Sequence, residues 1–108
     1  MKVFFDHNVP RKLRKSLRDH QISTAAELGW QELDNGALLS AVEEAGFEVM
    51  VTADKNITDQ QNWTNRKLAL VVLSTNNWTV IRLRDAPFVR AVRFARPGTF
   101  TYVEFRSP

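Results

Sequence analysis

Two short stretches of the chain have the composition of a site for a divalent cation. Each consists of an apolar run, an aspartate, one spacer residue and an asparagine, which gives Asp6-x-Asn8 and Asp54-x-Asn56. Apolar runs of this kind are typical of buried parallel strands, and ligands of open α/β sheets bind beyond the carboxyl ends of such strands. Because Mg²⁺ and Mn²⁺ prefer oxygen ligands, we predict a metal site held by Asp6, Asp54 and Asn56.

A third contribution to this site is expected from residues 34–35, at the start of a later helix. Two carboxylates rarely share a pocket without a cation, so we predict a catalytic set made of Asp6, Asp54, Asn8, Asn56, Asp34 and Asn35. Asparagine after a strand is often a helix N-cap, and for Asn8 and Asn35 the two roles are about equally supported. The alternation of side chains along a strand turns His7 away from Asp6, so we expect His7 on the surface.

The size and composition of the chain indicate an ordinary globular protein. Its 108 residues suit one domain over residues 1–108, and 44% of them are hydrophobic and 25% charged. There is no cysteine, which excludes a disulfide framework and a thiolate metal site. No apolar run resembles a signal-peptide core or a membrane span. We therefore expect a soluble, cytoplasmic protein without a membrane partner.

Charge is distributed in three blocks along the chain. Positions 2–18 hold six basic residues, positions 27–59 hold eight acidic residues, and positions 66–106 hold eight basic residues. Basic flanks suit the binding of a polyanion such as RNA, although three solvated surfaces without a partner would give the same composition. The candidate RNA-binding residues lie on the first helix, beside the second aspartate and in a run of amides: Arg11, Lys12, Lys15, Lys55, Gln60 and Gln61.

Apolar runs alternate with helical patterns along the chain. We predict strands at residues 2–5, 22–26, 47–52 and 68–73, and a final edge strand at 99–105. Helices are predicted to run from Asn8 and Pro10 to about residue 19, from residues 34–35 to Gly46, over a short stretch with a capping box at 58–61, and in two segments between residues 78 and 97. This alternation is typical of an α/β fold with a mostly parallel sheet of four to five strands.

The polar motifs together resemble a known family. The pattern Asp6-x-Asn8-Val9-Pro10, then Asn35-Gly36, then Thr52-x-Asp54-x-Asn56 is similar to the small bacterial PIN-like family of predicted toxin–antitoxin nucleases, and residues 60–62 and 70–73 fit it as well. The resemblance implies a PIN-like three-layer sandwich and a metal-dependent ribonuclease using Mg²⁺ or Mn²⁺. It also implies that Asp6 and Asp54 hold the metal and that a cognate antitoxin is a partner. Whether the chain forms a homodimer is left open.

Two departures from the family pattern leave other functions open. Asn35 and Asn56 occupy positions where the wider family has aspartate, with Asp34 and Asp59 nearby as substitutes, and a site of lower charge binds its metal more weakly. One alternative is therefore a non-catalytic PIN-like module that binds RNA or protein. A receiver domain phosphorylated at Asp54 is disfavoured, because an acidic pair after the first strand and a lysine after a late strand are both missing.

Overall fold

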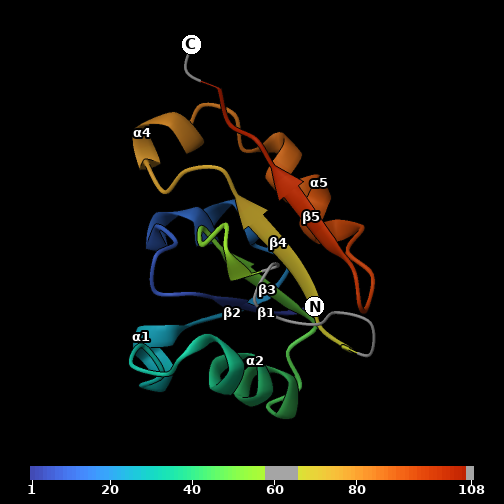
Figure 1. The fold of residues 1–108 in the computed structure, drawn as a ribbon. Coiled ribbons are helices and arrows are strands. Elements are labelled where there is room, and N and C mark those ends of the chain that lie inside the picture. Colours follow the sequence, from blue (N-terminus) through green and yellow to red (C-terminus); the bar gives the residue numbers. More distant parts are fainter. Residues whose placement is uncertain (58–65, 107–108) are drawn as a thin grey trace.

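The computed structural model describes residues 1–57 and 66–106. Its centre is one sheet of five strands in the order β2-β1-β3-β4-β5, and every pair of neighbours is parallel (Figure 1). The strands are β1 (Lys2–Phe5), β2 (Gln21–Thr24), β3 (Val49–Thr52), β4 (Ala69–Leu73) and β5 (Phe100–Val103). The predicted α/β class is confirmed, and the final strand joins the sheet in the parallel sense at its edge.

Helices cover both faces of the sheet. Figure 1 shows α1 and α2 on one side and α4 and α5 on the other. A 3-10 helix, η1, covers the same face as α4 and α5, because their side chains share one core cluster. The helices are η1 (Arg11–Leu17), α1 (Ala25–Leu28), α2 (Asn35–Glu44), α4 (Trp78–Ile81) and α5 (Ala86–Arg93). The three layers are those predicted.

The core consists of two clusters, one on each face of the sheet. Successive side chains of a strand point to opposite faces, so Val3 and Phe5 join one cluster while Phe4 joins the other. The first cluster contains Leu13 of η1 and Phe88 of α5. The second contains side chains of α1 and α2, including Ala25, Leu38, Leu39 and Val42. Burial on both faces explains why β1, β3 and β4 read as unbroken apolar runs.

Several predicted boundaries differ from the structure. The first helix is a 3-10 helix that ends at Leu17, and its N-cap is Pro10 without a side-chain hydrogen bond. The second strand ends at Thr24, because the Thr24 and Glu27 side chains form a capping box that starts α1. Gly46 follows the end of α2 with φ of 85°, as predicted. The short helix predicted from residue 58 lies outside the described residues.

The strand order creates a switch point next to β1. The chain moves outward from β1 to β2, then returns to the other side of β1 to continue through β3, β4 and β5. In doubly wound sheets of this order, ligands bind at the carboxyl ends of the strands where the order reverses. Asp6 follows β1 and Asp54 follows β3, so both aspartates lie at that edge. In the part of the chain that the structure describes, no helix is long and apolar enough to span a membrane.

Candidate metal centre

Buried polar side chains mark the carboxyl edge of the sheet. Among the described residues, the polar or charged residues that are buried are Asp6, Thr24 and Thr52, with 4%, 5% and 0% of their surface exposed. Thr24 ends β2, Asp6 follows β1 and Thr52 ends β3. Burying a carboxylate is costly unless it is paired and hydrogen-bonded. The contacts made by Asp6 are therefore the starting point for the site.

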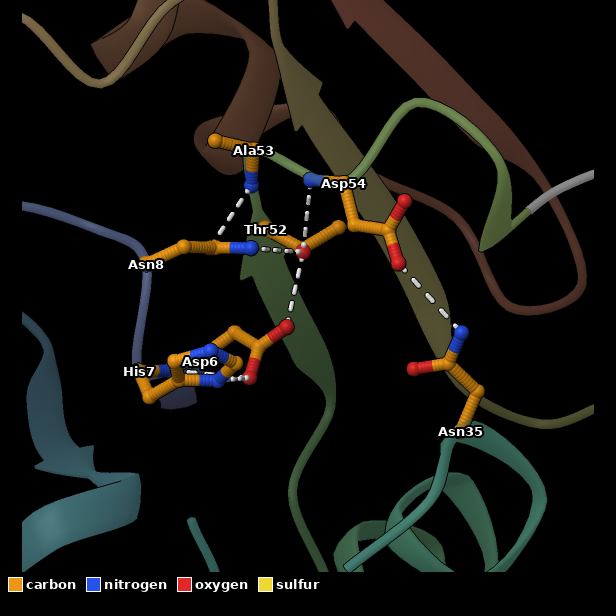
Figure 2. Close-up of polar contacts among 7 residues, drawn as sticks. All are labelled: Asp6, His7, Asn8, Asn35, Thr52, Ala53 and Asp54. Carbon is orange, nitrogen blue, oxygen red and sulfur yellow. Dashed lines mark hydrogen bonds and ion pairs between the residues drawn. The ribbon is translucent and has the colours of Figure 1, made fainter. Parts of the chain in front are cut away.

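The hydroxyl group of Thr52 connects the two aspartates. Its Oγ1 donates a hydrogen bond to Oδ2 of Asp6 over 2.8 Å and accepts one from the backbone N–H of Asp54 over 3.1 Å (Figure 2). Oγ1 also accepts a longer bond of 3.5 Å from the amide of Asn8. A hydroxyl group has one donor and two acceptor positions, so all three are used. Thr52 thus orients the Asp6 carboxylate and the start of the loop that carries Asp54.

Asn8 joins the loop after β1 to the end of β3. Its Oδ1 accepts a hydrogen bond from the backbone N–H of Ala53 over 2.9 Å, 45 residues away in sequence. The expectation that Asn8 could cap the first helix is wrong, since its side chain is directed to β3 and the N-cap of η1 is Pro10. Asn8 instead fixes the relative positions of the two Asp-x-Asn segments.

The Asp54 carboxylate lies between its own loop and the start of α2. Oδ1 accepts a hydrogen bond from the backbone N–H of Asn56 over 3.0 Å, which closes a local turn. Oδ2 accepts one from the Asn35 amide over 3.3 Å (Figure 2). Asp34 is used differently, because its carboxylate accepts the backbone N–H of Ala37 over 2.9 Å and caps α2. Of the two residues at this helix start, Asn35 contacts the site and Asp34 is the cap.

His7 lies against Asp6 rather than away from it. Its backbone N–H donates to Oδ1 of Asp6 over 2.8 Å, and its ring Nδ1 lies 3.1 Å from the same oxygen. Strand alternation predicted the opposite orientation, and that prediction is wrong because β1 ends at Phe5 and the chain turns at His7. The imidazole is nevertheless largely exposed, with 61% of its side chain accessible. The expected surface position is thus confirmed.

The oxygen atoms at this edge are of the type that binds hard cations such as Mg²⁺. Oδ1 of Asp6 faces two groups of His7, whereas Oδ2 accepts a hydrogen bond from Thr52 and, as a carboxylate oxygen with two lone pairs, keeps further acceptor capacity. The described residues contain no group of three or more His, Cys, Asp or Glu side chains that could hold a metal. Mg²⁺ is commonly held by one or two carboxylates, with waters and substrate phosphates completing its shell. Two carboxylates flanked by amide groups fit that requirement.

The structure describes four of the six predicted RNA-binding residues. Arg11, Lys12 and Lys15 are exposed on η1, and Lys55 is exposed in the loop after Asp54. Gln60 and Gln61, like the alternative acid Asp59, lie outside the described residues. Asn56 is exposed, and its backbone N–H donates to the Asp54 carboxylate.

Sequence reasoning assigned no role to Thr52, which is central to the hydrogen-bond network. It is the last residue of β3 and the buried polar end of an otherwise apolar strand. A fully buried hydroxyl group must find hydrogen-bond partners. A threonine at the end of a buried strand, two residues before an aspartate, could therefore have indicated a polar contact at this position. Its partner Asp6, however, is 46 residues away and cannot be identified from local pattern.

Comparison with known proteins assigns the chain to a family. Residues 1–75 match the family described as "PIN like domain". The matched segment includes Asp6, Asn8, Asn35, Thr52 and Asp54. It covers well over half of the chain, which therefore belongs to the PIN like domain family. No curated protein and no solved structure gave a significant match.

Proposed function

We propose that this protein is a metal-dependent ribonuclease that hydrolyses phosphodiester bonds of RNA. The observation that carries the proposal is the Thr52 hydroxyl group, which holds the Asp6 carboxylate and the backbone N–H of Asp54 at the switch point of the sheet. Burying a carboxylate at a ligand-binding edge costs desolvation free energy, and a metal site would explain why this cost is tolerated. The family to which the chain belongs supports the same class of activity.

Some residues of the site would bind the cation, and others would hold the two binding segments in position. Asp6 and Asp54 would hold the cation, while Asn8 and Thr52 keep the two segments in register. A bound Mg²⁺ or Mn²⁺ would supply charge stabilisation at the phosphate and a water of lowered pKa. Rotation of the Asn35 amide would turn its carbonyl oxygen towards the site, so Asn35 can serve as a neutral oxygen donor where a carboxylate is absent.

The proposed substrate and partners follow from charge. The exposed cations of η1 and Lys55 would bind the RNA backbone. We propose that the protein acts in the cytoplasm as the toxin of a toxin–antitoxin pair. An antitoxin with a basic side chain directed at the two aspartates would block the site, because it would replace the cation.

A metal titration combined with cleavage assays tests this proposal. Calorimetry should show Mn²⁺ binding to the wild type and none to the double variant Asp6→Ala/Asp54→Ala, with folding checked by circular dichroism. Asp54→Asn keeps the acceptor for the Asn56 N–H and should abolish RNA cleavage. Asp19→Asn, an exposed aspartate after η1, is the matched control and should cleave normally. Undiminished cleavage by Asp54→Asn would contradict the assignment.

The second candidate function is a non-catalytic PIN-like module that binds RNA or a partner protein. Neutral residues at positions 35 and 56 favour it, as does the lack of a three-residue acidic group in the described part of the chain. Such a module needs no metal for its affinity. RNA binding without cleavage, together with no Mn²⁺ binding by the folded wild type, would support this function over the nuclease.

A further inference from the structure

A cavity lies beside Asp6, on the side away from Asp54. It has a volume of about 300 Å³ and is formed by the loop after β1, the start of η1 and α1 with the turn that follows; its lining residues are Asp6, His7, Val9, Arg11, Thr24, Ala25, Ala26 and Gln31. Because β2 and β3 flank β1 on opposite sides, this cavity lies over β1 and β2, whereas Asp54 follows β3. Asp6 is thus shared between the metal centre and the cavity.

The α1 wall of the cavity is held rigidly. The backbone N–H of Glu27 donates to Oγ1 of Thr24 over 3.1 Å, and the N–H of Thr24 donates to the Glu27 carboxylate over 2.8 Å. Gly29 then turns the chain with φ of 72°, and Trp30 packs its ring on Phe4 at 5.8 Å between centroids. These contacts fix the turn that carries Gln31 at the cavity, before any ligand binds.

The lining combines an apolar surface with a few polar groups. Val9 and Ala25 lie at the buried base of the cavity, and Ala26 is exposed beside them. Arg11, Gln31 and His7 are exposed and can donate or accept hydrogen bonds, and the Arg11 and His7 side chains are planar groups on which a base can stack. An apolar surface with few polar groups is typical of small-ligand sites, and about 300 Å³ is at the lower end of their size range. A cavity of this size can receive one base.

We propose that this cavity binds one unpaired nucleotide of the RNA, next to the phosphate that a cation on Asp6 would bind. The proposal rests on the ribonuclease function proposed above and specifies its substrate as single-stranded at that position. Arg11 begins the basic face of η1, so a strand bound along that face reaches the cavity directly. Gln31 reads the edge of the base, since a side-chain amide offers both a donor and an acceptor. Arg11 and Gln31 thereby determine base preference.

Two substitutions test the cavity in different ways. Ala26→Phe fills it without removing a polar group, and Gln31→Ala removes the amide while leaving the volume. The matched controls are Ala45→Phe, at the exposed end of α2, and Gln21→Ala, on the exposed start of β2. Fluorescence anisotropy in EDTA would measure affinity for a short single-stranded RNA, so that neither metal binding nor cleavage contributes. Circular dichroism and thermal unfolding would check that every variant folds.

We expect affinity about ten-fold weaker for Ala26→Phe and Gln31→Ala, because stacking and hydrogen bonding of one base have roughly that effect. The two controls should bind as the wild type does. Nucleoside monophosphates should shift the NMR amide signals of Ala25 and Ala26, whereas ribose 5-phosphate should not. Equal shifts by both probes would identify a phosphate site and overturn the proposal, as would unchanged affinity in the two cavity variants or no RNA binding by the wild type.

These experiments distinguish failure of the nucleotide site from failure of the nuclease proposal. If Asp54→Asn still cleaves RNA but Ala26→Phe weakens binding in EDTA, the metal assignment fails and the nucleotide site is upheld. If Asp54→Asn is inactive and both cavity variants bind normally, the nuclease is upheld and the nucleotide site is overturned.

Discussion

At the scale of single residues, Thr52 shows how one neutral side chain organises two charged ones. Its hydroxyl group contacts Asp6, Asn8 and the backbone of Asp54, and the residue is fully buried. Removing the hydroxyl would leave Oδ2 of Asp6 and the Asp54 N–H without this partner in a site from which water is largely excluded. The penalty for such unmade hydrogen bonds exceeds the net value of the bonds themselves.

Thr52→Val should therefore lower stability even though the side-chain shape is retained. We expect a loss of about 1–3 kcal/mol in the free energy of unfolding, measured by urea denaturation. Thr52→Ser keeps the hydroxyl and loses one methyl group, which should cost about 1 kcal/mol. Mn²⁺ affinity should survive in the serine variant and fall in the valine variant. If Thr52→Val has the same stability and the same Mn²⁺ affinity as the wild type, Thr52 does not position Asp6.

At the scale of elements, α1 is a helix of four residues that depends on its cap. A helix this short forms few internal hydrogen bonds, so the reciprocal contacts of Thr24 and Glu27 decide where it starts. Glu27 also forms an ion pair with Arg14 of η1, with 3.4 Å between Oε1 and Nη2. The capping box thereby connects the β2 end, α1 and η1 around the cavity beside Asp6.

Glu27 should make stability depend on pH in a defined direction. The Thr24 backbone N–H, with a smaller contribution from Arg14, holds the pKa of Glu27 below its usual value. The carboxylate therefore stabilises the fold fully above the unfolded value of about 4.3. This contribution declines as the pH falls through the lowered folded pKa.

Urea denaturation of Glu27→Gln and the wild type checks this direction. Their difference in unfolding free energy should be present in full at about pH 7 and smaller at about pH 3. It should be small, because Glu27 is exposed and solvent screens its charge. Glu32→Gln, an exposed glutamate in the following turn, is the control and should match the wild type at both values. A difference that grows on acidification would contradict the assigned cause.

At the scale of the whole molecule, the C-terminal elements complete the sheet that carries the site. The family match ends at residue 75, yet β5 pairs with β4 and α5 contributes buried residues to the core cluster below β1 and β3. Phe88 of α5 is fully buried, and its ring lies 6.4 Å from that of Phe5, the residue before Asp6. Packing by α5 thus supports the strand end from which Asp6 projects.

Phe88→Ala should be strongly destabilising because it leaves a cavity in this cluster. Substitutions of this kind cost about 3–5 kcal/mol, a large part of the roughly 5–15 kcal/mol that stabilises a typical domain. Phe94→Ala is the matched control, since Phe94 follows α5 and is 69% exposed. We expect its change in unfolding free energy to be within about 0.5 kcal/mol. Equal losses in the two variants, measured by denaturation, would show that α5 does not pack as described.

Local pattern was sufficient for much of the architecture. Unbroken apolar runs predicted β1, β3 and β4, because strands buried on both faces need no polar alternation. The start of α2 at Asp34 or Asn35 and its end at Gly46 were also predictable from residue type, although which of the two residues is the cap was not. The 3-10 form of η1 was not predicted, and α1 was mistaken for part of a strand. Four residues are too few for helical periodicity to show.

The amino-acid sequence by itself determined which segments are buried and that an aspartate follows two of them. Only the tertiary structure decided which polar groups meet: Asn8 with Ala53, Asn35 with Asp54, and Thr52 with Asp6. These partners lie 19 to 46 residues apart in sequence. Their contact depends on the order and register of the strands, which the packing of the whole sheet sets and no single segment encodes.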